Sequence, residues 1–337
     1  MKTPFQEHSQ FYRPLETDQQ ANQVVDISTW AIGGAFNPYA EGTRAKYEVT
    51  CAGMTGLTPF LKVGHRYLYK KTFERKGRDG GTPYVYYDQF WVEIAAYLVG
   101  RALGVEVPPA FVASRCDLNG TGEIEHAALI EWYYNYPGHV NCHVDRGGDL
   151  MSRLIEGYDR DKGRQHNFCT IRDFFENLPL EGWQEAWLRM LTFDTIIGNT
   201  DRHQENWELL SFPYDGGIGF ALSPAFDNGT AMGYDVIGKD VAKYIEKGTH
   251  HMKWHKDDAR SIGHFMLLEK LIETLPNARS TIAEIVSMNM EKAYNTIMSF
   301  PQYELQNPQY ALSDARAAWM ISLLKARIER IKKLVNA

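Results

Sequence analysis

The pattern of hydrophobic and polar positions predicts mainly strands in the first 135 residues. Residues 47–50 and 66–73 are short segments rich in aromatic and β-branched side chains, and turn residues precede or follow them. Residues 127–134 give the last strong strand signal, and the turn at 135–138 breaks it. This half of the chain therefore predicts a sheet.

One helix interrupts these strands. Residues 88–103 have apolar side chains at helical spacing, namely Phe90, Ile94, Tyr97 and Leu98. Gly104 suits the end of a helix because it can adopt a left-handed conformation, and the Pro-containing segment 105–109 turns into the next strand. We expect one amphipathic helix packed on the sheet.

The second half of the chain predicts helices. Residues 182–197 carry Trp183, Trp187, Met190 and Leu191 on one apolar face, which should be deeply buried. Similar stripes occur at 262–275 and 320–335, and Ser313 suits the N-cap of the last helix. The expected fold class is α+β, with a mainly β N-terminal lobe that contains one helix and a larger helical C-terminal lobe.

The length of 337 residues allows two such lobes around a cleft, since single domains commonly have about 100–150 residues. We expect a polar N-terminal arm at 1–28 that packs late or stays mobile. The N-terminal lobe should span 29–135 and the C-terminal lobe 136–337. The break at 135 is the predicted junction between them.

Composition excludes several classes of protein. The net charge of −6 gives no overall attraction to a phosphate backbone, so we expect no direct nucleic-acid binding. The four cysteines are widely spaced, which favours reduced structural thiols. Residues 1–8 lack a hydrophobic signal core, and no apolar run is long enough to cross a bilayer. We expect a cytoplasmic protein without membrane contact.

The segment at 198–207, followed by 222–228, holds the strongest candidate chemistry. Asp201 and Asn206 have D-x-x-x-x-N spacing, and Asp227 follows on the next predicted strand. Phosphoryl transfer needs a carboxylate near the attacking hydroxyl and hard oxygen ligands for Mg²⁺, which these three side chains can provide. The alternative is a polar turn in which Asp201 caps and Asn206 bonds the backbone.

At these residues the chain resembles the HipA-like serine/threonine kinases, whose core reads N-T-D-x-H-x-x-N followed by L-x-P-x-[YF]-D. The resemblance implies that Asp201 is the catalytic base and that Asn206 and Asp227 bind the metal. His203 belongs to the same catalytic loop, and we interpret it as a hydrogen-bond partner that organises the loop. ATP and Mg²⁺ are the implied cofactors.

Lys70 and Glu93 are the expected ion pair of the nucleotide site. Kinases place a Lys on such a strand to hold the α- and β-phosphates, and a helical Glu orients it. Side chains alternate along a strand, so only one of Lys70 and Lys71 can face the cleft, and the motif favours Lys70. The alternative for Glu93 is an ordinary exposed position on the helix.

Two further segments are candidate nucleotide contacts. The resemblance matches the family's G-x-x-x-K phosphate loop to Gly42 and Lys46, with Thr43 and Arg44 between them. An ordinary glycine-rich turn is the alternative there. By analogy with kinases, Glu131, Trp132 and Tyr133 are expected to contact adenine, although an ordinary edge strand explains them equally well.

The resemblance implies a serine/threonine protein kinase that transfers the γ-phosphate of ATP to a protein hydroxyl, autophosphorylation included. Family members are often toxins that phosphorylate a translation protein, such as an aminoacyl-tRNA synthetase, and are restrained by a DNA-binding antitoxin. Too few residues precede Gly42 for the family's extra N-terminal subdomain, so we expect a shorter relative. The alternatives are a lipid or small-molecule kinase of the same fold and a non-catalytic nucleotide-binding scaffold.

The histidines at 250–255 have two interpretations. A zinc site usually has four ligands in spaced pairs, and the nearest cysteine, Cys169, is distant in sequence. Contact with substrate or phosphate is the favoured interpretation.

Overall fold

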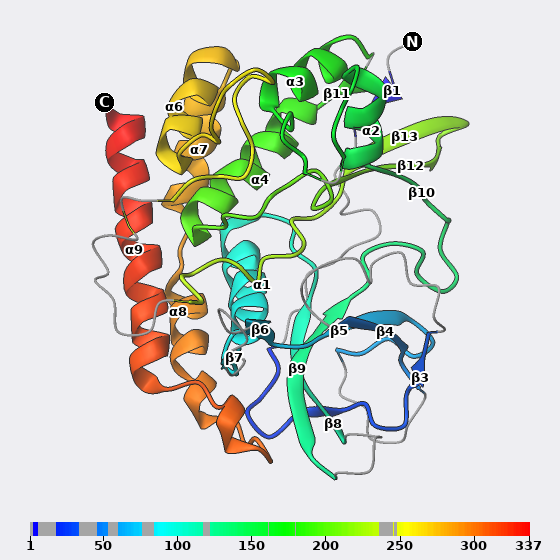
Figure 1. Cartoon of the computed structure of the whole chain (residues 1–337), viewed down its shortest axis with the longest axis vertical. Coiled ribbons are helices and arrows are strands. Elements are labelled where there is room, and N and C mark those ends of the chain that lie inside the picture. The colour runs from blue at the N-terminus through cyan, green and yellow to red at the C-terminus, as the bar shows by residue number, and fades with distance from the viewer. Residues whose placement is uncertain are drawn as a thin grey trace.

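The computed structural model describes residues 3–5, 18–33, 46–52, 60–75, 84–116, 122–160, 162–178, 180–235, 245 and 248–337. Figure 1 shows the strands of the largest sheet at one end of the molecule, and most helices, with a smaller sheet, at the other end and along one side. The predicted α+β fold with two lobes is confirmed.

The N-terminal lobe is built on a six-stranded sheet in the order β2-β8-β9-β5-β4-β3. Its strands are β2 (Val25–Asp26), β3 (Ala31–Ile32), β4 (Lys46–Thr50), β5 (Arg66–Lys70), β8 (Ala110–Cys116) and β9 (Ile124–Glu131). All neighbours are antiparallel except β2 and β8. A separate hairpin, β6 (Phe73–Arg75) and β7 (Tyr84–Tyr86), follows β5.

The predicted helix of this lobe is α1 (Trp91–Leu103), which begins three residues later than the apolar pattern indicated. It ends at Gly104 in the left-handed conformation, with φ 66°. A Cβ on Gly100 would lie 2.3 Å from the Val107 side chain. Only glycine allows this close return of the chain, so Gly100 fixes how α1 packs against the segment leading into β8.

The C-terminal lobe contains a small antiparallel sheet and most of the helices. The sheet has the order β10-β12-β13, from β10 (His143–Arg146), β12 (Glu208–Tyr214) and β13 (Gly217–Leu222). The helices are α2 (Gly147–Leu154), α3 (Phe168–Glu176), α4 (Trp183–Ile197), α6 (His264–Thr274), α7 (Ala278–Ser287), α8 (Glu291–Met298) and α9 (Asp314–Asn336). The short 3-10 helices Phe300–Gln302 and Pro308–Tyr310 join α8 to α9.

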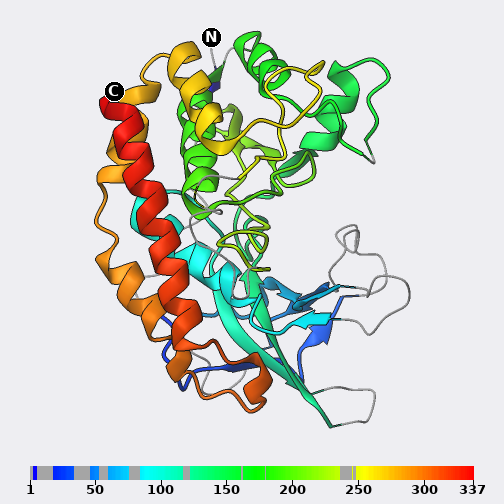
Figure 2. The ribbon, with the colours of Figure 1, turned by 60° about the vertical axis from the view of Figure 1, so that its left-hand side comes forward.

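Helix α4 is the centre of the larger lobe, and its predicted aromatic face is buried. Helix α9 begins with the predicted N-cap, because the Ser313 side chain accepts a hydrogen bond from the Arg316 amide. Figure 2 shows α9 running along one side of the molecule, past both the helices and the sheet. None of the described helices combines the length and apolar character needed to span a membrane.

The described pieces of the predicted arm at 1–28 pack against both lobes. Strand β1 (Thr3–Pro4) pairs with β11 (Leu180–Glu181) of the C-terminal lobe. Residues 18–28 lie on the sheet and reach the C-terminal helices, where the Tyr303 hydroxyl donates to the Gln19 carbonyl at 2.8 Å. The N-terminal residues therefore bridge the two lobes.

Candidate active site

Lys70 lies where three elements meet. Its ammonium group contacts the carboxylate of Glu93 on α1 and lies 2.6 Å from Oδ1 of Asp227, which follows β13. Lys70 is 2% exposed and Glu93 is 4% exposed. The second oxygen of Glu93 accepts from the Asn228 amide at 3.0 Å. The sheet, α1 and the Asp227 segment are thus joined through one buried lysine.

Strand β5 ends at Lys70, and the alternation of side chains continues to the next residue, Lys71. Lys71 points away from Glu93 and forms an ion pair with Glu125 at 2.7 Å, at a partly exposed position. Lys46 on β4 is directly opposite Lys70 in the antiparallel register. Directly paired residues share a face of the sheet, so Lys46 is on the same face as Lys70.

The segment after α4 forms a compact loop. Gly198 ends the helix in a left-handed conformation, with φ 68°. The Asp201 amide donates to the Asn199 side chain at 3.0 Å, and the Asp201 carbonyl accepts from the Asn206 side chain at 2.6 Å. The main chain of Asp201 therefore holds the loop, while its carboxylate has no hydrogen-bond partner among the described residues.

His203 makes hydrogen bonds within the same loop. Its Nδ1 accepts from the Glu205 amide at 3.1 Å, and its carbonyl accepts from the Asn206 amide at 3.0 Å. Its ring meets His251 edge to face, with the centroids 5.6 Å apart. His251 thus places the segment after residue 248 beside the loop.

Arg202 is the buried centre of the site, and the sequence reasoning missed it. All five of its N–H groups have acceptors: two on the Asp194 carboxylate, one on the Asn228 side chain, and the carbonyls of Asn206 and Phe226. The side chain is completely buried. One guanidinium group therefore fixes the Asn206 loop and the Asp227 segment relative to each other.

Asp194 on α4 is the counter-ion of Arg202, and it is also buried. His250 Nε2 lies 3.2 Å from its second oxygen. Burial alone would raise the pKa of Asp194, but Arg202 and His250 lower it below its ordinary value. An Asp within an apolar helix needs a buried partner, so Asp194 in the 182–197 pattern could have pointed to a buried cation such as Arg202.

Asp227 adopts an unusual backbone conformation. Its φ is 55°, in the left-handed region that costs a non-glycine residue free energy. Such strain at an Asp is often found at functional sites, where surrounding contacts hold it. Here the Phe226 ring before it stacks on Tyr133, with the centroids 5.3 Å apart. The Tyr133 hydroxyl in turn donates to Glu208 at 2.5 Å.

The three residues expected at adenine lie at and just beyond the end of β9. The Glu131 carboxylate is buried and bonds Lys62 at 2.5 Å and the Tyr136 hydroxyl at 2.8 Å. The Trp132 amide donates to the Arg66 carbonyl, and the Trp132 carbonyl accepts from His65 Nε2 at 2.6 Å. The adenine contact stays a prediction. The amide and the carbonyl of Trp132 both already have hydrogen-bond partners in the protein.

His65 beside this segment is neutral at neutral pH. Burial lowers its pKa to about 4, and nearby Lys62 and Arg66 add to the effect. A neutral ring that donates from Nε2 to the Trp132 carbonyl has Nδ1 as its acceptor nitrogen. This histidine therefore acts as a structural donor where the two lobes join.

The candidate residues are not all placed by the structure. It brings together Lys70, Glu93 and Asp227, and Arg202 links Asp227 to the loop of Asp201, His203 and Asn206. The phosphate-loop residues Gly42, Thr43 and Arg44 lie outside the described residues.

Two oxygen donors at this site are of the kind that Mg²⁺ binds. Asp227 offers a carboxylate, and the Asn206 amide oxygen has no hydrogen-bond partner within the described part of the chain. No group of three or more His, Cys, Asp or Glu side chains is placed to hold a metal among the described residues. His250 is instead bonded to Asp194.

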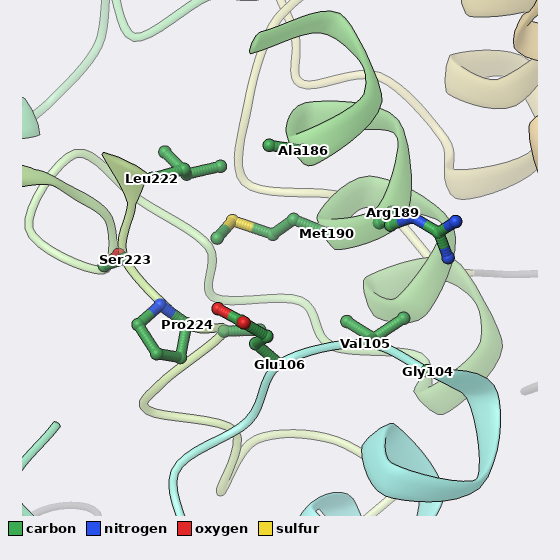
Figure 3. Close-up of a pocket in the computed structure, with 10 residues that line it drawn as sticks. Gly104, Val105, Glu106, Ala186, Arg189, Met190, Leu222, Ser223 and Pro224 are labelled. Atoms are coloured by element: carbon green, nitrogen blue, oxygen red, sulfur yellow. The ribbon is translucent and has the colours of Figure 1, made fainter. Parts of the chain in front are cut away.

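A small cavity lies apart from this site. Figure 3 shows it between the end of α1, helix α4 and the strand end that precedes Asp227. Its volume is about 40 Å³, and it is lined by Gly104, Val105, Glu106, Ala186, Arg189, Met190, Leu222, Ser223, Pro224 and Ala225. None of the candidate catalytic residues lines it, and it is too small for a nucleotide.

A known bacterial protein is similar to part of this chain. A protein of Sinorhizobium fredii strain NGR234, Y4dM, which is named a candidate kinase, is 26% identical over 196 residues. The match covers 56% of this chain and 46% of that protein, so the chain spans about half the length of this relative.

Two solved structures are similar to this chain to different degrees. The Helicobacter pylori proinflammatory kinase CtkA superposes with a TM-score of 0.64 at 13% identity, over 93% of this chain and 97% of that one. HipA of Shewanella oneidensis, from a complex with HipB and operator DNA, matches with a TM-score of 0.45 at 13% identity, over 89% and 66% of the two chains. The first likeness shows a kinase-like fold.

Residues 39–295 match the family of HipA-like C-terminal domains, a range that contains every candidate site residue named above. Because this range is well over half of the 337 residues, the chain belongs to the HipA-like C-terminal domain family.

Proposed function

We propose that this protein is an ATP- and Mg²⁺-dependent serine/threonine protein kinase. The observation that carries the proposal is the buried Lys70, which contacts both Glu93 and Asp227 beside the Asp201 loop. Active kinases need a strand lysine paired with a helical glutamate and an Asp that holds the metal. The family and the kinase-like fold support the same reaction class.

Each side chain has a role that follows from its place. Lys70 holds the α- and β-phosphates, and Glu93 keeps its ammonium group in position. Asp201 accepts the proton of the acceptor hydroxyl, since its carboxylate has no hydrogen-bond partner in the described residues. Lys46 shares the Lys70 face of the sheet and adds positive charge for the nucleotide.

Asn206 and Asp227 are the residues that would hold Mg²⁺, which neutralises phosphate charge when it is bound. Arg202 fixes the main chain next to both of them, so their side chains are preorganised. His203 keeps the intervening loop in shape. The site thus needs little rearrangement around the nucleotide.

The acceptor is proposed as a serine or threonine of a protein, such as an aminoacyl-tRNA synthetase or another translation protein. An antitoxin partner and autophosphorylation belong to the same proposal, which rests on the likeness to HipA-like kinases. The net charge of −6 favours a protein acceptor over direct nucleic-acid binding.

We expect Lys70→Met to lower ATP turnover about 10²-fold or more, because it removes the charge that contacts the phosphates. Lys71→Met is the matched control, since Lys71 is the residue directly after β5 and its side chain bonds Glu125 instead of Glu93. It should keep nearly full turnover. ADP release from both purified variants tests this. Equal losses of turnover in the two variants would show that Lys70 is not the phosphate contact.

A further inference from the structure

Arg316, in the first turn of α9, lies at a junction outside the candidate site. Its side chain is 12% exposed, and its guanidinium carbon lies over the Trp319 ring, 4.9 Å from the centroid. Nη2 donates to the Met232 carbonyl at 3.1 Å, and Nε lies 3.8 Å from the Asp88 carboxylate. Its partners therefore belong to two different segments of the chain.

Those two segments lead to the candidate site. Asp88 lies three residues before the start of α1, which carries Glu93. Met232 is fully buried five residues after Asp227, and its amide donates to the Ile197 carbonyl at the end of α4, at 2.8 Å. Its φ of 48° is unfavourable for a residue with a side chain, so this conformation depends on such contacts.

Other buried contacts cross the same junction. The Gln89 side chain donates to the Gly229 carbonyl and accepts from the Phe73 amide at 3.1 Å. The Trp91 indole donates to the Tyr310 carbonyl at 2.9 Å and packs on Phe300. The start of α1 is thus bonded to the Asp227 segment on one side and packed against the C-terminal segment 300–316 on the other.

We propose that Arg316 is a positioning residue that holds α1 and residues 228–232 in the arrangement in which Lys70 contacts both Glu93 and Asp227. This inference rests on the proposed kinase function, because it assigns Arg316 to the regulation of that site. Arg316 itself contacts none of the candidate nucleotide residues that the structure describes. The last helix of the chain would therefore supply the contact that keeps the site assembled.

The expected effect of losing Arg316 on MgATP binding follows from the fraction of molecules in which the site is assembled. If only a fraction of molecules holds the assembled site, the apparent affinity for MgATP falls by that fraction. Bound MgATP then restores the assembled arrangement, so turnover at saturation is largely retained. Substitution of a residue with only a structural role would lower the melting temperature. It would not weaken MgATP binding while leaving kcat unchanged.

The test compares Arg316→Met with Arg316→Lys, which keeps a charged donor, and with Lys332→Met, a surface change on the same helix. MgATP affinity and kcat at saturating MgATP are measured at a temperature where every variant is folded. We expect Arg316→Met to weaken binding about tenfold while kcat stays within about twofold. Arg316→Lys should restore most of the affinity, and Lys332→Met should match the wild type.

Hydrogen exchange without nucleotide gives a readout that does not depend on kinase activity. Amides of α1 and residues 228–232 should exchange faster in Arg316→Met than in Lys332→Met. If Arg316→Met does not fold, Arg316→Gln is measured in its place. Unchanged exchange together with unchanged MgATP affinity would overturn the inference. If the wild type binds no MgATP while Arg316→Met still exchanges faster than Lys332→Met, the kinase function is refuted and the positioning contact stands.

Discussion

Asp201→Asn is expected to bind MgATP almost as the wild type does and to lose phosphoryl transfer by about 10²- to 10⁴-fold, the usual contribution of a general base. The loop is held by the amide and carbonyl of Asp201 and by the Asn206 and Asn199 side chains. None of these contacts uses the Asp201 carboxylate, so an isosteric amide should leave the loop in place.

The measurement is a MgATP titration followed by an assay of transfer to an acceptor protein or to the kinase itself. Glu205→Gln is the matched control, since it also removes a carboxylate from this loop, but one that bonds Arg160 on the surface. It should change neither quantity much. Parallel loss of binding and transfer in Asp201→Asn would make Asp201 a metal ligand or a structural residue instead of the base.

Arg202→Met is expected to lower the free energy of unfolding by about 3–5 kcal/mol, because it leaves the buried Asp194 carboxylate without its counter-ion. The same change removes the bonds to the Asn206 and Phe226 carbonyls. We therefore expect it to disturb the loop at 198–207 and the Asp227 segment together.

Urea unfolding at neutral pH gives the comparison. Arg160→Met provides the control, since Arg160 is also bonded to two carboxylates, Asp149 and Glu205, but its side chain is 41% exposed. Exposed ion pairs contribute about 0–1 kcal/mol, so the control should unfold close to the wild type. Similar stability of the two variants would show that Arg202 is not the buried link between the two segments.

Much of the fold could be predicted from local patterns. Helix α4 and strand β5 follow from apolar periodicity, and the Gly104 and Ser313 helix ends follow from capping preferences. These signals are local, since each depends on residues within one or two turns. The start of α1 was predicted three residues too early, because Phe90 continues the apolar pattern of the helix although residues 87–90 form turns.

The candidate loop at 198–207 could be proposed from the sequence, because its residues are close together in the chain. The ion pair of Lys70 with Glu93 spans 23 positions and needed the kinase analogy. Arg202 and Asp194 were missed because their importance depends on burial, which periodicity does not report for a polar side chain. Arg316 could not be predicted, since Asp88 and Met232 come to it only in the folded protein.

Transfer of radiolabelled γ-phosphate from ATP tests the central claim most directly. The wild type should label a protein, either itself or an added acceptor, in the presence of Mg²⁺ and not in the presence of a chelator. Asp227→Ala should abolish the labelling, and Asp257→Ala, at an exposed surface position, should retain it. Label on an added lipid or small molecule alone, no label at all, or full labelling by Asp227→Ala would contradict the assignment as a protein kinase built on this site.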